Sequence, residues 1–137
     1  MQLEKGPTET SPENGNGIKD AEIRYRACLD ALFPGGISEG NKRLLRQRLG
    51  VKADIDIKSV AERKAKQGDV SVVGILETTR LPNAEKWKIL GTAYAHRLED
   101  LKPLADAAPE YRGKLEYAAE TVRILNNGAE KLSQKQQ

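Results

Sequence analysis

Residues 83–132, NAEKWKILGTAYAHRLEDLKPLADAAPEYRGKLEYAAETVRILNNGAEKL, decide the fold of this chain. In the first half, apolar or small residues recur at alternating steps of three and four, at Ala84, Trp87, Gly91, Tyr94, Leu98 and Leu101. The second half repeats this spacing at Tyr111, Leu115, Ala118, Val122, Leu125, Ala129 and Leu132. Each set therefore lies on one face of an α-helix. The short connector favours an antiparallel hairpin in which the two faces bury each other.

Prolines and asparagines mark the expected ends of the two hairpin helices. Asn83 follows a proline and is expected to cap the first helix. Pro103 should end or kink that helix, and Pro109 suits the first turn of the next one. The Asn-Asn-Gly sequence at 126–128 can stop the second helix, but the apolar spacing continues beyond it. We therefore expect a frayed extension there.

Composition and length predict one soluble, charge-rich helical domain. The chain has 137 residues, of which 38% are hydrophobic and 31% charged. No apolar run approaches the roughly 18 residues of a membrane span, and no secretory signal precedes the first helix. The single cysteine, Cys28, cannot form an internal disulfide, which favours a reducing cytoplasm.

The chain divides into tails, a basic helical part and the hairpin. Residues 1–17 contain little to bury and are expected to be a disordered tail, and residues 134–137 a second tail. Between them, a single domain is predicted over 18–133, with the basic helical part at 18–80 and the hairpin at 83–133.

Three helices are expected in the basic helical part. The first covers 19–33 and ends at Pro34-Gly35-Gly36, with Cys28 on its buried stripe. The second covers 39–49, between a Ser38 cap and a Gly50 stop. The third covers 57–66. Together with the hairpin they predict an all-α fold.

Two segments leave a short β-ribbon open as an alternative. Residues 51–57 alternate between apolar and polar, which suits a strand but also an extended linker that ends at Asp56 as a helix cap. Residues 70–77 are rich in β-branched side chains, which favours a second strand. We prefer a helix over 70–79, because isolated two-stranded ribbons are marginally stable.

No set of residues supports enzymatic chemistry. Residues 36–40 match the G-x-S-x-G pattern of a hydrolase nucleophile, but a helix and a turn precede them where that motif needs a strand. Ser38 is better explained as a helix cap, and Cys28 as a small buried side chain. His96 lies four residues before Asp100, but two ligands are too few for a metal site. A non-enzymatic protein without metal or cofactor is predicted.

Positive charge is concentrated in residues 38–66, here named the basic segment. It holds nine basic and four acidic residues, although the whole chain has a net charge of only +3. The leading hypothesis is a nucleic-acid-binding or regulatory protein whose phosphate contacts come from Lys42, Arg43, Arg46, Arg48, Lys58, Arg63, Lys64 and Lys66. Contact with four or five phosphates predicts that affinity falls with salt at a log–log slope of about −4.

The alternative hypothesis is an adaptor or inhibitor that binds another protein. Its interface would be the arginine-rich helix at 39–49 or the outer face of the hairpin. Tyr117 and Ile124 lie beside the main hairpin stripe, and they extend its apolar face enough for a third helix, a second subunit or a partner to pack there.

Overall fold

The structure, a computed structural model, describes residues 13–135, with the side chains of residues 17–135. This part contains six α-helices and one 3-10 turn, and no strand occurs within it. The elements are α1 Glu13–Leu32, α2 Glu39–Leu49, α3 Asp54–Ala65, α4 Val72–Leu76, α5 Asn83–Ala107, η1 Pro109–Tyr111 and α6 Arg112–Lys135. The predicted all-α fold is confirmed.

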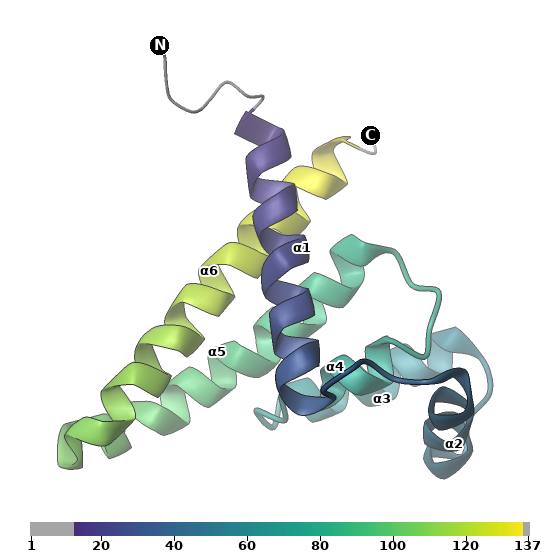
Figure 1. Cartoon of the computed structure of the whole chain (residues 1–137), viewed down its shortest axis with the longest axis horizontal. Coiled ribbons are helices and arrows are strands. Elements are labelled where there is room, and N and C mark those ends of the chain that lie inside the picture. Colours follow the sequence, from purple (N-terminus) through teal and green to yellow (C-terminus); the bar gives the residue numbers. More distant parts are fainter. Residues whose placement is uncertain (1–12, 136–137) are drawn as a thin grey trace.

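The helices α5 and α6 form the predicted hairpin and lie antiparallel, side by side (Figure 1). They are the longest elements, with 25 and 24 residues. Much of the predicted apolar spacing is buried, at Ala84, Trp87, Gly91 and Leu101 of α5 and at Ala118, Leu125 and Ala129 of α6. The contact between the apolar stripes of α5 and α6 is therefore the main packing interaction of the fold.

The ends of the hairpin helices differ from the sequence prediction. Pro82, not Asn83, is the N-cap of α5, and its carbonyl accepts the N–H groups of Glu85 and Lys86 at 3.0 and 3.1 Å. The helix continues past Pro103 to Ala107. Pro103 is exposed in the last turns of α5, where water can satisfy a carbonyl that has lost its N–H partner.

The bounds of the two expected tails and the fraying expected after 126–128 also differ from the structure. The frayed extension expected after 126–128 is regular helix, because α6 runs on to Lys135 and so includes part of the tail predicted at 134–137. At the other end, α1 begins at Glu13 and includes the last residues of the tail predicted at 1–17. The rest of that tail, residues 1–12, lies outside the described part.

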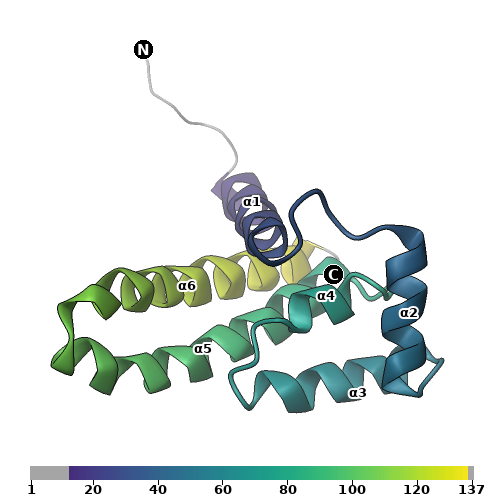
Figure 2. The same ribbon diagram turned by 60° about the horizontal axis from the view of Figure 1, so that its bottom comes forward.

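The helix α1 packs across α6 and also contacts α4 (Figures 1 and 2). Its approach is closest at Gly128, where an added Cβ would lie 2.2 Å from the Cβ of Ala21. Further along the contact, the Arg24 guanidinium donates to the Thr121 hydroxyl at 2.9 Å and pairs with Glu120. Gly128 thus serves close helix packing, which explains why it does not end α6.

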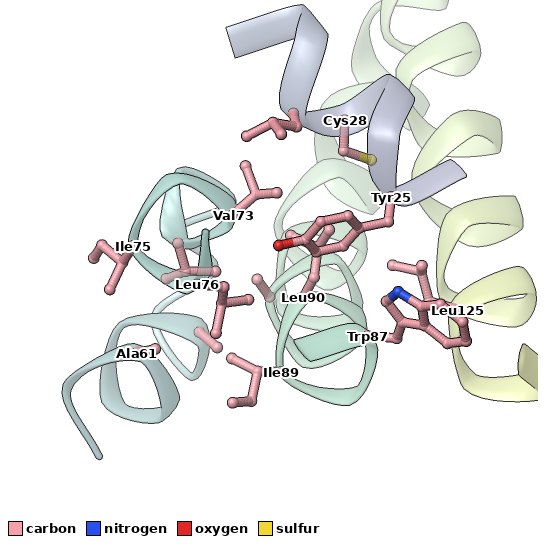
Figure 3. Close-up of a cluster of buried hydrophobic side chains, with 14 of the residues drawn as sticks. Tyr25, Cys28, Ala61, Val73, Ile75, Leu76, Trp87, Ile89, Leu90 and Leu125 are labelled. Carbon is pink, nitrogen blue, oxygen red and sulfur yellow. The ribbon is translucent and has the colours of Figure 1, made fainter. Parts of the chain in front are cut away.

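The helices α3 and α4 cover another face of α5, and the core lies where five helices meet. Figure 3 shows Ala61 of α3 and Val73 and Leu76 of α4 on the side that faces Ile89 and Leu90 of α5. Trp87 and Leu125 lie next to one another within the same cluster. Because α5 is buried on two faces, Ile89, Leu90 and Ala93 are core residues that the single predicted stripe left out.

A mostly buried polar link crosses this core. The Tyr25 hydroxyl of α1 donates to Glu77 Oε2 at 2.6 Å, and Lys86 Nζ lies 3.7 Å from the same carboxylate. Glu77 follows α4 and Lys86 is in the first turns of α5, so three elements are joined. Burial, together with the Glu77 carboxylate, raises the pKa of Tyr25.

The alternative β-ribbon is wrong at both segments. The helix α3 begins at Asp54, with Ala53 and not Asp56 as its N-cap. Asp54 and Asp56 lie in its first turn, where carboxylates stabilise a helix. Ile57 is buried on the same face as Ala61 and Ala65.

At 70–77, every residue of the short helix α4 is buried. Burial on all sides accommodates β-branched side chains in a helix. The preferred helix at 70–79 is therefore confirmed over Val72–Leu76.

Gly128→Ala should lower the free energy of unfolding by about 1–3 kcal/mol, because the new methyl group forces α1 away from α6. The change can be measured by denaturant unfolding followed by the fluorescence of Trp87, the single tryptophan. Gly113→Ala on the same helix is the control. An added Cβ there meets nothing within 4 Å, so stability should stay unchanged or rise by up to about 1 kcal/mol. Equal effects of the two changes would contradict the close packing.

Candidate functional site

The helix α2 has the predicted bounds, and both of its ends are fixed locally. The Ser38 hydroxyl accepts the backbone N–H of Asn41 at 3.1 Å, which confirms the predicted N-cap. At the other end, Gly50 adopts a left-handed conformation with φ 73°, and its N–H donates to the Gln47 carbonyl. Such caps stabilise the helix without any contribution from the core.

None of the α2 side chains is buried. The helix stands at the edge of the molecule, away from the hairpin (Figure 2), and contributes no labelled residue to the core in Figure 3. Leu44 is 51% exposed, while Leu45 and Leu49 are half-buried. Because an isolated helix of 11 residues is marginal in water, α2 depends on its caps and on the contacts that tether it.

Arg46 is the tether. Its guanidinium donates to the carbonyl of Thr78 at 2.6 Å, to Asp54 Oδ1 at 3.0 Å and to the carbonyl of Lys52. The other oxygen of Asp54 accepts the N–H of Arg80 at 3.1 Å. The Arg80 N–H and then Arg46 hold the pKa of the Asp54 carboxyl below its ordinary value. The chain itself thus occupies an arginine that was predicted to contact phosphate.

Two further predicted phosphate contacts form ion pairs within the chain. Lys42 lies 3.1 Å from Glu39 on α2, and Lys58 lies 2.6 Å from Glu85 on α5. The hydrogen bond to Glu85 raises the pKa of Lys58. The remaining five predicted residues make no ion pair within residues 17–135, and all but the half-buried Lys64 are exposed: Arg43, Arg48, Arg63, Lys64 and Lys66.

These five residues do not share one surface. Arg43 and Arg48 lie on α2, whereas Arg63, Lys64 and Lys66 lie at the end of α3 that is farther from α2 (Figure 2). Twelve residues of α3 span about 18 Å at 1.5 Å per residue. The basic segment therefore folds into two separate cationic groups, and sequence proximity overstated its continuity.

Grooves border α2 on two sides. The apolar groove, of about 220 Å³, is lined mainly by Phe33, Ile37, Leu44 and Leu45, together with Gly36, Asn41 and Arg48. The cationic groove, of about 440 Å³, is lined by Arg43, Arg46, Gln47, Gly50, Val51 and Lys52. The helix α2 is thus a ridge with an apolar side and a cationic side.

The apolar groove could not be recognised from the leucines of residues 39–49, because their spacing does not show whether that side of the helix is covered. A usable signal was present. The charge-dense helix at 39–49 carries three leucines and lies between Gly35-Gly36 and Gly50. Glycines at both ends of a short amphipathic helix indicate a unit that is set apart from the core.

Tyr117 and Ile124 lie on the side of α6 that faces α1. Ile124 is half-buried against the core, whereas Tyr117 keeps 40% of its surface exposed. The Arg24 guanidinium lies 4.6 Å from the centre of the Tyr117 ring, and the Tyr117 hydroxyl lies 3.6 Å from Cys28 Sγ. Tyr94 meets this ring edge-on, with 6.2 Å between the ring centres. The third helix that packs on this face is α1, so much of the predicted partner surface is used within the chain.

The remaining candidates for chemistry lie apart from one another. Cys28 is buried in the α1 contact, as predicted, whereas His96 and Asp100 are exposed on α5. Burial and the nearby thiol raise the pKa values of Tyr94 and Tyr117. Within residues 17–135, no three His, Cys, Asp or Glu side chains are grouped closely enough to hold a metal ion. None of the helices described is both long and apolar enough to span a membrane.

Comparison with protein-family models, with curated proteins and with solved structures found no match for this chain. The site is therefore interpreted from its own geometry.

Arg46→Ala should loosen α2 while the hairpin stays folded, because the guanidinium supplies the hydrogen bonds that hold this unburied helix. Hydrogen exchange of amides 39–53 should accelerate at least about tenfold, with α5 and α6 unchanged. Arg43→Ala, an exposed arginine on the same helix, is the control and should leave exchange unaltered. Unchanged exchange in Arg46→Ala would show that α2 is held in some other way.

The Asp54 carboxyl should titrate below its ordinary pKa of 3.8 in the folded chain. Its stabilising contribution is then complete above pH 3.8 and is lost as the pH falls through the lower, folded pKa. Carboxyl-carbon NMR can follow the titration. Arg46→Ala should move the midpoint up only in part, because the Arg80 N–H, the larger cause, remains. A midpoint at or above 3.8 in the unaltered chain would contradict the network.

Proposed function

We propose that this is a non-enzymatic binding protein in which α2 contacts a macromolecular partner, most simply another protein. One observation carries the proposal: α2 buries none of its side chains, yet caps and a three-acceptor arginine hold it in place. A helix whose side chains all stay at least partly exposed and that is nevertheless held in place is suited to recognition. The exposed leucine and the two grooves beside it supply a surface for contact.

A protein partner fits this surface better than a nucleic acid does. The groove along one side of α2 is apolar, and apolar contact is the main source of affinity at the centre of protein interfaces. Three of the eight predicted phosphate contacts, Lys42, Arg46 and Lys58, are already in ion pairs. The remainder is divided between α2 and the far end of α3.

Nucleic-acid binding or a regulatory role through nucleic acid is the second candidate. Arg43, Arg48, Arg63 and Lys66 are exposed and make no ion pair within residues 17–135, which favours it. Two cationic groups about one α3 length apart can contact phosphates at two places on an extended strand or duplex. Such binding would weaken steeply with salt, whereas apolar docking in the groove would not.

Photo-cross-linking tests the proposal in the cells that produce the protein. A photoreactive amino acid at Leu44, which is 51% exposed, should cross-link to one protein species. The matched control is Leu104, a 44% exposed leucine near the end of α5 that is distant from α2 (Figure 2). No such species should form from Leu104.

Three results would contradict α2 docking on a protein. Cross-links to nucleic acid from Leu44 would support the second candidate. A specific protein cross-link from Leu104 alone would place the interface on the hairpin. Absence of any specific product from Leu44 would remove α2 as the contact element.

A further inference from the structure

The apolar groove has a firm floor. The Phe33 ring lies against Gly74 of α4 so closely that an added Cβ at Gly74 would be 2.6 Å from Phe33 Cζ. Gly74 lies in α4, whose residues are all buried, so Phe33 packs directly against the core. Ile37 and Leu49 also pack against the core at the two ends of α2. The groove therefore belongs to the folded body and is not a gap in a loose loop.

The outer wall of the groove is held at a set distance. The helix α2 supplies this wall through Leu44 and Leu45, and Arg46 ties α2 to Thr78 and Asp54. The side chains of these two leucines gain burial only when something else covers them.

The charge around α2 selects the kind of partner. No carboxylate is among the residues that line the apolar groove, and Arg48 is the cation among them. Three further cations, Arg43, Arg46 and Lys52, line the cationic groove on the other side of α2. The one acidic residue of α2, Glu39, is already paired with Lys42. A partner that seats apolar side chains in the groove gains further from carboxylates beside them, and a basic partner is repelled.

The length of α2 limits the contact to about three helical turns. Its 11 residues span about 16 Å. Apolar side chains at positions i, i+3 or i+4, and i+7 of a partner helix span about 10 Å, which fits within this length. Such an interface buries less than about 1,200 Å², which corresponds to a transient contact.

We propose that the apolar groove between Phe33 and α2 seats an acidic amphipathic helix of a partner protein, with its apolar residues in the groove and its carboxylates beside Arg48. The inference rests on the proposed function, since it names the chemistry of the partner that α2 contacts.

Selection from a display library of helical peptides tests the charge and the pattern of the occupant. The full chain is the target, and the library varies both the apolar spacing and the net charge. Enriched peptides should be acidic and should carry apolar residues at i, i+3 or i+4, and i+7. Their dissociation constants should be micromolar, as expected for a small interface.

Two variants then place the peptides on the groove. Leu44→Asp and Arg48→Glu change exposed side chains, so the fold should be retained, which circular dichroism can verify. Each should weaken peptide binding by at least about tenfold. Leu104→Asp is the matched control for a new carboxylate on an exposed leucine, and it should leave binding unchanged. Enrichment of neutral or basic peptides, or insensitivity to Leu44→Asp, would overturn the inference.

Other outcomes separate this inference from the proposed function. Sedimentation that shows a dimer dissociated by Leu44→Asp would make a second copy the occupant and overturn the acidic-helix partner. A specific protein cross-link at Leu44 without enrichment of acidic peptides would leave α2 docking in place and remove only the partner chemistry. If neither a cross-link at Leu44 nor enrichment of acidic peptides is found, both the proposed function and the acidic partner helix are contradicted.

Discussion

The burial of α5 on two faces is the constraint on which the rest of the structure depends. One face meets α6 through Trp87 and Leu125, and the other meets α3 and α4 through Ile89 and Leu90. A modest share of hydrophobic residues can build a core in this way, because one helix serves two interfaces. Small residues then allow α1 to close over α6. The N-terminal helices are thereby assembled around the C-terminal hairpin.

The helix α2 differs from the other α-helices in having no fully buried side chain. Its position comes from local caps and from the hydrogen bonds of Arg46, with only partial burial of Leu49 against the core. Charge-assisted hydrogen bonds of this kind are directional, so they fix orientation while the side chains of the helix stay accessible. The division suits a protein in which the core supplies stability and one peripheral helix supplies recognition. The apolar groove is the direct product of that division.

Charge in this protein serves two purposes that the linear sequence does not separate. Three cations form ion pairs within the chain: Lys42 within α2, Arg46 between α2 and α3, and Lys58 between α3 and α5. Two others, Arg43 and Arg48, are exposed to solvent beside the grooves. All five lie within the same basic segment. Whether a cation forms an ion pair depends on where the fold places carboxylates such as those of Glu85 and Asp54. The count of positive charges therefore overstates the surface that is available to an anionic partner.

The hairpin, the bounds of α2 and the burial of Cys28 could be predicted from the sequence, because helical periodicity, capping residues and side-chain size act over a few neighbouring residues. The second buried face of α5 could not, since it depends on where α3 and α4 pack. The helical start at Asp54 was hidden by an accidental alternation of polar and apolar residues. At the candidate site, the sequence alone determined that residues 39–49 form a capped, arginine-rich helix. Only the tertiary structure decided that this helix stays outside the core, because long-range contacts such as Arg46 to Thr78 and Phe33 to Gly74 set its position.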